Sequence, residues 1–194
     1  MPLILLSLAV TVGLLTLLGN RAVQLPAVIG GGTNGVLLAA FLPIPLVVTI
    51  NYGLSSRDRL NERIALRPVS RWDAALVVAT LLVLALSVTL VGLLTTAEPI
   101  GFIRNALLLT GVAVGIGSVA TPAAGSTGVV AIVVLTNSVG PAVSGASYVR
   151  LMQSPPHNVW AWSVAATVLI IGLVVLATGV RISSWSAGSD QGVR

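Results

Sequence analysis

The charged residues of this chain gather in one short segment. Only fifteen of its 194 residues are charged, and eight of these lie between Ser55 and Ala74. We call residues 55–74 the arginine-rich segment. Guanidinium and carboxylate groups at this density suit ion pairing with a partner protein or with anionic lipid. The eight are Arg57, Asp58, Arg59, Glu62, Arg63, Arg67, Arg71 and Asp73.

Several residue types that carry chemistry are missing. The chain has no Cys and no Lys, and its single histidine is His157. This composition excludes disulfides, thiolate nucleophiles, Schiff-base lysines and the lysine of a phosphate-binding P-loop, and it leaves too few ligands for a classical zinc site. We therefore predict that the chain is not an enzyme, lacks ATPase motifs of its own, and binds no cofactor or metal itself.

One short motif of the chain contains a serine that could act as a nucleophile. "GASY", Gly145 to Tyr148, resembles the Gly-Ala-Ser segment of rhomboid intramembrane proteases, in which a serine and a histidine from different helices form a dyad. Here the histidine follows ten residues later on the same predicted external segment, a geometry that argues against a dyad. We interpret His157, beside Asn158, as a helix-start or interface residue. A small membrane enzyme is the weakest of the alternatives.

The composition predicts which solvent surrounds the chain. Hydrophobic residues make up 56% and charged residues 8%, with a mean hydropathy of +1.03, whereas a soluble domain has about 25% charged residues. We predict an all-α integral membrane protein with six spans in residues 1–182 and a short polar tail at 183–194. The six apolar runs are Leu3–Leu18, Gly35–Leu54, Ala74–Thr96, Ala106–Thr121, Thr127–Val143 and Val159–Val180.

Arginine positions predict the orientation of these spans. Placing the five arginines of the arginine-rich segment at the hydrocarbon centre costs about 2.5–3.5 kcal/mol each, so the segment must be a loop, and the positive-inside rule makes it cytoplasmic. Both termini then lie inside, and Arg21, Arg104 and Arg150 lie outside. The first run alternatively resembles the core of a secretory signal, but no basic segment precedes it. The tryptophans divide accordingly, with Trp72 and Trp185 at the inner interface and Trp160 and Trp162 at the outer one.

The arginine-rich segment has helix signals of its own. Ser55 and Asp58 have the spacing of a capping box, and Pro68 ends the helix near Leu66. The spacing of Ser70 and Asp73 predicts a second cap at the start of the third span. From the residues alone, two interpretations stay open: a solvated loop that only fixes topology, and a docking helix for a cytoplasmic partner.

A resemblance favours the docking helix. "RLNERIALRPVSRWDAALV", residues 59–77, resembles the segment after the second span in membrane subunits of type-two ABC exporters. The resemblance implies that residues 56–66 form a coupling helix that fits a cleft in a separate ATPase subunit, which binds ATP and Mg²⁺. It also implies that Arg59, Glu62 and Arg63 contact the ATPase, and that Pro68, Val69 and Ser70 form the turn into the third span. Residues 144–160 are similar to the short re-entrant external helices of that family.

Small and polar residues mark the predicted helix contacts. Gly111 and Gly115 have small-xxx-small spacing, which indicates close helix packing or, alternatively, a dimer seam or a wall of the translocation pathway. Pro43 and Pro45 predict a kink in the second span that suits a gate. No charged residue is predicted at mid-membrane, which disfavours an ion-coupled carrier. The polar residues predicted to make interhelical hydrogen bonds are Asn51, Thr80 and Asn137.

Together these observations predict a membrane subunit of an ATP-driven ABC exporter in the bacterial plasma membrane. Its expected cargo is a hydrophobic or amphipathic drug, peptide or lipid. Its expected partners are a cytoplasmic ABC ATPase, a second copy or a related permease subunit, and membrane lipid. The net charge of +5 is explained by topology, so no nucleic-acid partner is expected. The alternative is a non-transporting subunit that anchors or regulates a larger membrane complex.

Overall fold

The computed structural model describes residues 2–18, 21–26, 28–29, 33–55, 69–94, 99–139 and 151–178. In this part of the chain each of the six predicted apolar runs contains one α-helix, so the mostly helical fold is confirmed. The predicted tail at 183–194 lies outside the described residues. The helices are α1 (Pro2–Leu18), α2 (Pro43–Ser55), α4 (Val69–Leu94), α5 (Pro99–Val119), α6 (Pro122–Ser138) and α8 (Val159–Thr178).

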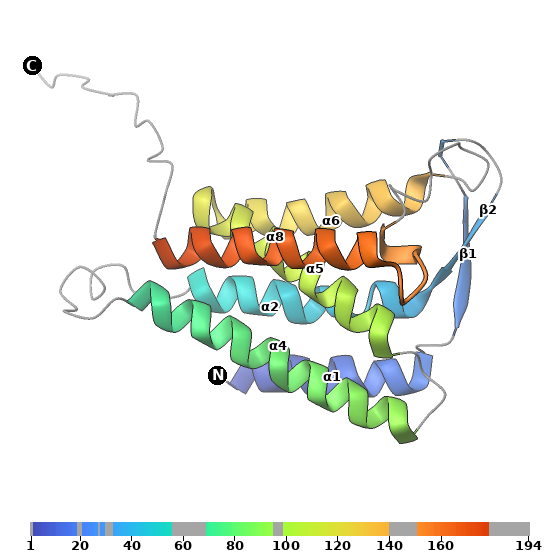
Figure 1. Ribbon diagram of the computed structural model, residues 1–194, viewed down its shortest axis with the longest axis horizontal. Helices are drawn as coiled ribbons and strands as arrows, with labels where there is room; N and C mark the ends of the chain where they lie inside the picture. Colours follow the sequence, from blue (N-terminus) through green and yellow to red (C-terminus); the bar gives the residue numbers. More distant parts are fainter. Residues whose placement is uncertain are drawn as a thin grey trace, which may run out of the picture.

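The six helices lie side by side and alternate in direction (Figure 1). One end of this bundle holds the end of α2 at Ser55 and the start of α4 at Val69. We call it the arginine-rich end. The start of α1, the turn between α5 and α6, and the end of α8 lie at the same end. The start of the first helix and the end of the last described helix therefore lie at the same end of the bundle as the two helix ends that flank the arginine-rich segment.

Helix α5 occupies the centre of the bundle and packs against α2, α4, α6 and α8. Apolar side chains fill the space on its two sides. One cluster joins α5 to α1, α2 and α4 through Leu15, Leu46, Ile50, Val77, Leu81, Leu84, Val88, Phe102, Ala106 and Val114. A second cluster includes Val36, Ala40, Val47, Leu108, Leu109, Ala113, Val129, Val133, Met152 and Ala165.

A β-hairpin joins α1 to the second apolar run at the opposite end of the bundle, which we call the hairpin end (Figure 1). Strands β1 (Ala22–Pro26) and β2 (Thr33–Leu37) are antiparallel, with Ala22 paired to Leu37. The hydropathy of the sequence predicts a span from Gly35 onward and no strand. Apolar content alone does not distinguish a short buried strand from a helix, because both are rich in aliphatic side chains.

The start of α2 differs from the expected kinked helix. A 3₁₀ turn, η1 (Leu38–Ala40), and two turn residues precede it. The helix itself begins at Pro43, and Pro45 still lies in its first turn. The N–H groups of a first helical turn have no acceptor within the helix, so a proline, which lacks an N–H, loses no hydrogen bond there. The two prolines therefore start α2 and do not kink its interior. Its 13 residues span about 20 Å.

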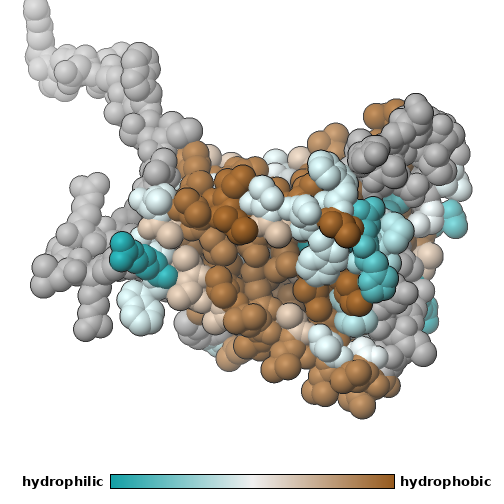
Figure 2. Space-filling model, viewed as in Figure 1, coloured by the Kyte–Doolittle hydropathy of each residue, from teal (hydrophilic) through white to brown (hydrophobic). Residues whose placement is uncertain are grey.

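Three helices are long and apolar enough to cross a membrane: α4 over Ser70–Leu94, α5 and α8. Helices α1 and α6 and the segment Leu38–Leu54 are apolar but shorter. Among the described residues the structure thus supports three of the six predicted spans by length. Figure 2 shows apolar side chains across the middle of one face, with polar side chains gathered toward its ends. Such a band is typical of a bilayer-facing surface.

Close packing of α5 on α8 depends on glycine. A Cβ atom at Gly111 would lie 2.6 Å from the backbone nitrogen of Leu169, and one at Gly172 would lie 2.6 Å from the carbonyl oxygen of Gly111. A Cβ at Gly115 would lie 3.4 Å from the Cα of Gly172. The pair predicted from its spacing therefore faces a helix of the same chain, and α8 covers this face of α5.

Gly111→Ala should destabilise the fold, because the new methyl group collides with backbone that cannot move independently of α8. We expect a loss of about 1–3 kcal/mol, measured as the thermal unfolding midpoint in detergent. Gly101→Ala is the matched control on the same helix, since nothing lies within 4 Å of its Cβ position. That control should be neutral or stabilising by up to about 1 kcal/mol. Equal effects of the two substitutions would contradict the packing argument.

Candidate functional site

The predicted ATPase-coupling residues fall mostly outside the described part of the chain. Arg59, Glu62, Arg63 and Pro68, with the predicted helix over 56–66, belong to residues that the structure does not describe. Val69 is the first residue of α4, and Ser70 follows in its first turn. The structure therefore describes the two helix ends that hold the arginine-rich segment.

Ser70 ties the start of α4 to the end of α8. Its hydroxyl donates to the carbonyl oxygen of Ala177 at 3.0 Å. The last carbonyls of a helix have no intrahelical donor, so this hydroxyl satisfies one of them. The sequence analysis expected Ser70 to cap its own helix with Asp73, but α4 already begins at Val69. The Ser70 hydroxyl therefore makes a contact between helices α4 and α8. The side chain of Asp73 is buried, with 6% of its surface exposed.

Asn51 ties the other side of the segment to α6. Its side-chain nitrogen donates to the carbonyl oxygen of Pro122 at 2.7 Å and to the hydroxyl of Ser126 at 3.3 Å. Only 3% of Asn51 is exposed. Gly117 on α5 and Gly125 on α6 make room for it, because a Cβ at either glycine would collide with the Asn51 side chain. The predicted interhelical hydrogen bond is confirmed at Asn51.

The other two polar predictions differ in outcome. The hydroxyl of Thr80 donates to the carbonyl oxygen of Leu76 in its own helix at 2.8 Å, so it makes no interhelical bond there. Buried threonine hydroxyls commonly satisfy themselves in this way. Asn137 accepts a hydrogen bond from Gln153 at 2.5 Å, which links α6 to the 3₁₀ turn η2 (Leu151–Gln153). The prediction is wrong for Thr80 and confirmed for Asn137.

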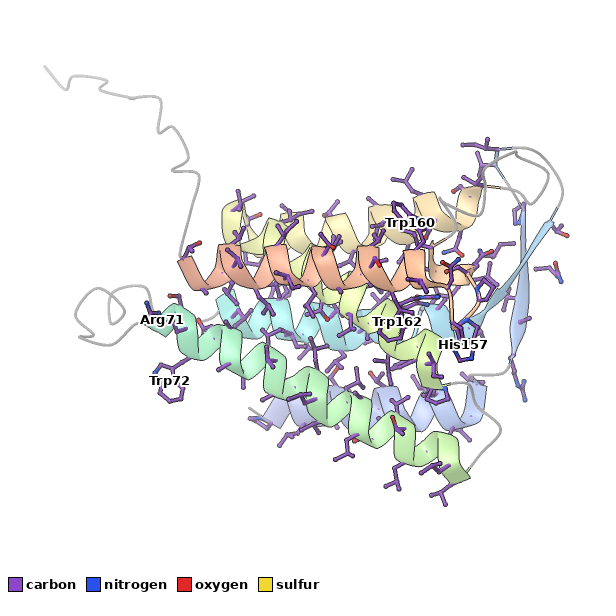
Figure 3. The ribbon with its side chains drawn as sticks, in the orientation of Figure 1. Arg71, Trp72, His157, Trp160 and Trp162 are labelled. Carbon is purple, nitrogen blue, oxygen red and sulfur yellow. The ribbon has the colours of Figure 1, made fainter. Side chains whose placement is uncertain are left out.

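Exposed tryptophans mark the two ends of the bundle. Arg71 and Trp72 project from α4 at the arginine-rich end, whereas Trp160 and Trp162 lie at the hairpin end with His157 (Figure 3). The indole N–H of Trp162 donates to the carbonyl oxygen of Pro156 at 2.8 Å. The predicted separation of these tryptophans is confirmed, and Trp185 lies outside the described residues.

A buried arginine holds the segment before α8. Arg104 was expected in an external loop, but it lies inside α5 and is only 2% exposed. One terminal nitrogen of its guanidinium donates to the carbonyl oxygens of Ser154 at 3.1 Å and Pro155 at 3.0 Å. The other donates to the carbonyl of Met152 and the side chain of Asn105, both at 3.4 Å. Asn105 also donates to Met152 at 3.1 Å.

The acceptors around Arg104 are uncharged oxygens. Every hydrogen bond from its guanidinium to a described residue ends on a main-chain carbonyl or an amide oxygen. A charged donor makes stronger bonds than a neutral one, and the planar fork reaches several carbonyls at once. Arg104 thus anchors the main chain of residues 152–155 on α5. Sequence reasoning missed this role because an isolated arginine near a span end reads as a topology signal.

The predicted external re-entrant segment is described only in part. Residues 151–153 form η2, in which Met152 is buried at 4% exposure, and residues 144–150 lie outside the described part. The serine of the protease-like "GASY" pattern is among these undescribed residues, and His157 is exposed. Among the described residues no group of three or more His, Cys, Asp or Glu could hold a metal ion.

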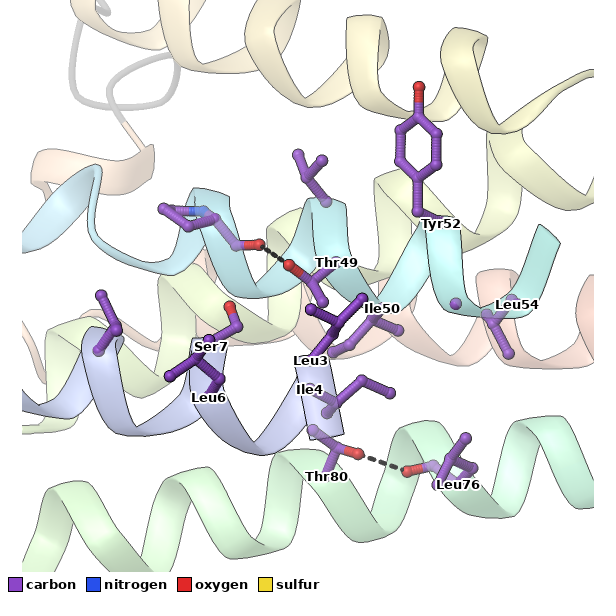
Figure 4. Close-up of a pocket in the computed structure, with 14 residues that line it drawn as sticks. Leu3, Ile4, Leu6, Ser7, Thr49, Ile50, Tyr52, Leu54, Leu76 and Thr80 are labelled. Atoms are coloured by element: carbon purple, nitrogen blue, oxygen red, sulfur yellow. Dashed lines mark hydrogen bonds between the residues drawn. The ribbon is translucent and has the colours of Figure 1, made fainter. Parts of the chain in front are cut away.

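An apolar groove of about 870 Å³ lies between α1, α2 and α4 (Figure 4). It extends toward the arginine-rich end along Pro45 to Leu54 of α2. Ile50, only 3% exposed, lies at its base, and the exposed side chains of Leu3 and Leu6 form its rim. The groove offers aliphatic surface to a ligand.

Comparison with known proteins gives no family. No family model, no curated protein and no solved structure matches this chain. The contacts and the charge distribution of the chain itself are therefore the basis for a functional proposal.

Removing the Arg104 anchor should release the segment before α8. In Arg104→Met the carbonyls of residues 152, 154 and 155 lose their charged donor, and we expect a loss of about 3 kcal/mol in unfolding measurements in detergent. Arg104→Lys should recover only part of this, because an ammonium group lacks the planar fork. Arg21→Met is the control, since Arg21 is exposed at the same end. An Arg104→Met protein as stable as this control would refute the anchoring role.

Proposed function

We propose that this chain is the transmembrane subunit of an ATP-driven ABC exporter in the bacterial plasma membrane. All six helices span the bilayer, both chain termini and the arginine-rich segment face the cytoplasm, and a separate ABC ATPase binds ATP and Mg²⁺. One observation carries the proposal. The two helices that hold the arginine-rich segment are each hydrogen-bonded, through Asn51 and Ser70, to a different helix of the bundle.

The surface of the helices supports the membrane location. Large apolar side chains such as Leu86, Leu93 and Leu135 are 74%, 79% and 62% exposed, which water would not favour over such an extended area. Helices α1 and α6 have 17 residues each and reach about 25 Å. A bilayer can adapt to helices slightly shorter than its hydrocarbon thickness by local thinning.

In the proposed exporter, the hydrogen bonds of Asn51 and Ser70 transmit movement from the ATPase into the helix bundle. ATP binding draws the two ATPase subunits together and moves the coupling helix predicted over residues 56–66. Asn51 passes this movement from the last turn of α2 to α6, and Ser70 passes it from the first turn of α4 to α8. Because α5 packs against all four of these helices, the rearrangement reaches the centre of the bundle.

The proposed cargo is apolar or amphipathic. The described helices present mainly aliphatic surface. The guanidinium of Arg104, near one end of the bundle, already donates hydrogen bonds to main-chain carbonyls and is buried. A second copy or a related subunit completes the pathway between the two membrane subunits. The α8 helix covers the Gly111 face, so that pairing uses other surfaces of the bundle.

Cysteine labelling tests the orientation directly, because the chain has no cysteine of its own. We expect Gln24→Cys, at the exposed β1 strand, to react with a membrane-impermeant maleimide in intact cells. Ser56→Cys, in the arginine-rich segment, should react only after the cells are permeabilised. Labelling of Ser56→Cys in intact cells would overturn the proposed orientation and with it the cytoplasmic docking of an ATPase.

Charge reversal tests the coupling site. The chain is co-expressed with the ABC ATPase encoded nearest its gene, and the two are co-purified. Glu62→Lys combined with Arg63→Glu should reduce ATPase recovery at least about tenfold, because like charges then face each other across the interface. Arg21→Glu, at the hairpin end, is the control and should leave recovery unchanged.

Two outcomes of this experiment would count against the exporter. If the double variant inserts normally and binds the ATPase as well as the unmodified chain does, the arginine-rich segment is not the coupling site. If the unmodified chain inserts but retains no ATPase at all, the result favours the alternative of a non-transporting anchor or regulatory subunit.

A further inference from the structure

The apolar groove at the arginine-rich end has a size that suits a ligand. Its volume of about 870 Å³ lies within the range of roughly 300–1,000 Å³ that is typical of small-molecule sites. Three helices contribute to its walls, and the side chains that line it come from α1, α2 and α4 (Figure 4). Its lining includes Leu3, Ser7, Thr49, Gly53, Leu76 and Thr80.

The length and direction of the groove match one leaflet of a bilayer. On α2 it extends from Pro45 to Leu54, a distance of about 14 Å along the helix axis. The hydrocarbon core of a bilayer is about 30 Å thick. A groove that begins near the arginine-rich end therefore reaches roughly the middle of the membrane, which is the depth of a single acyl chain.

Two of the hydroxyl groups in the groove, those of Thr49 and Thr80, are already used, whereas the buried Oγ of Ser7 makes no hydrogen bond to a described residue. Thr49 donates to the carbonyl oxygen of Pro45 at 2.7 Å, and Thr80 donates to that of Leu76 at 2.8 Å. Because a hydroxyl has a single hydrogen to donate, neither threonine has a donor left for a ligand. These walls suit a hydrocarbon chain better than a polar molecule.

Beyond the groove lining, toward the arginine-rich end, α4 carries an exposed aromatic ring and an exposed arginine. Trp72 precedes Leu76 and Thr80 at intervals of four residues, so the three lie on the same side of α4, and Trp72 lies one turn beyond the groove lining toward the arginine-rich end. Trp72 is 64% exposed, and Arg71 beside it is exposed as well (Figure 3). Residues 57 to 71 include five arginines and two acidic residues. This excess of positive charge complements an anionic lipid headgroup.

We propose that the groove binds one acyl chain of an anionic phospholipid from the cytoplasmic leaflet, with the headgroup against Arg71. The bound lipid fills the space between α1, α2 and α4 and places its phosphate beside Arg71. The proposal rests on the membrane location and the orientation of the proposed function but requires no ATPase, so a failure of the ATPase coupling leaves it standing.

Native mass spectrometry of the purified full-length chain tests this site. The detergent-solubilised protein is titrated with phosphatidylglycerol and, separately, with phosphatidylcholine of the same acyl chains. We expect one phosphatidylglycerol to be retained at a lipid concentration roughly fivefold lower than the concentration at which phosphatidylcholine is retained. This factor corresponds to the attraction of about one arginine for an anionic headgroup. Arg71→Glu should abolish this preference without weakening phosphatidylcholine binding, whereas Arg21→Glu should leave it intact.

Two substitutions close the groove itself. Ser7→Trp places an indole in it, and Gly53→Leu extends a side chain from a position whose Cβ meets only Ile4 at an ordinary 3.6 Å. Both should lose retention of either lipid. Leu86→Trp is the matched control, because Leu86 is 74% exposed on α4 outside the groove. Thermal unfolding measurements identify a variant that fails to fold. If one of the two groove variants does not fold, the lipid retention of the other one tests the site.

Two results would overturn the site. One is equal retention of the two lipids by the unmodified chain, and the other is undiminished retention in folded groove variants. If the groove instead seats a second copy of the chain, Ser7→Trp will convert a dimer to a monomer and leave lipid retention unchanged. Loss of ATPase association in the charge-reversal experiment has no bearing on these lipid measurements.

Discussion

The close approach of α5 and α8 is the constraint on which the rest of the bundle depends. Gly111 and Gly172 place the two backbones in direct contact, so α8 lies directly against the central helix. In a bilayer, lipid tails are as apolar as leucine, and helix association therefore depends on close packing more than on hydrophobic burial. With α8 fixed on α5, the remaining helices have a rigid surface on which to assemble.

Single polar side chains connect the helices around this centre. Asn51 joins α2 to α6, Ser70 joins α4 to α8, and Arg104 joins α5 to the main chain before α8. The acceptor of at least one bond in each case is a main-chain carbonyl oxygen. A main-chain carbonyl accepts a hydrogen bond whichever side chain its residue carries. These bonds therefore fix the relative position of the two segments without requiring a charged residue on the partner segment. None of them is an ion pair, and the desolvation of the buried Arg104 guanidinium is offset by its several hydrogen bonds.

The sequence predicts the helices of this fold better than the contacts between them. Hydropathy locates all six helices, and the glycine spacing at Gly111 and Gly115 correctly indicates a packed face. Which helix covers that face depends on Gly172, fifty-seven residues after Gly115 in the chain, and no local pattern connects them. Arg104 is misplaced for a similar reason, since its acceptors are main-chain atoms that any sequence at residues 152–155 provides. The hairpin is missed because Val36 and Leu37 are as suitable for a span as for a strand.

The two helices that flank the arginine-rich segment differ in stiffness along their length. Helix α4 is continuous over 26 residues, so it behaves as a single rod of about 39 Å. Helix α2 is shorter, because it begins only at Pro43, and two turn residues and the 3₁₀ turn η1 connect it to the hairpin. The segment from Val69 to Leu94 is thus one continuous helix, whereas the segment from Leu38 to Ser55 is divided by the turn at residues 41–42. A movement imposed at the arginine-rich end would therefore act on a single long lever in α4 and on a lever of about half that length in α2.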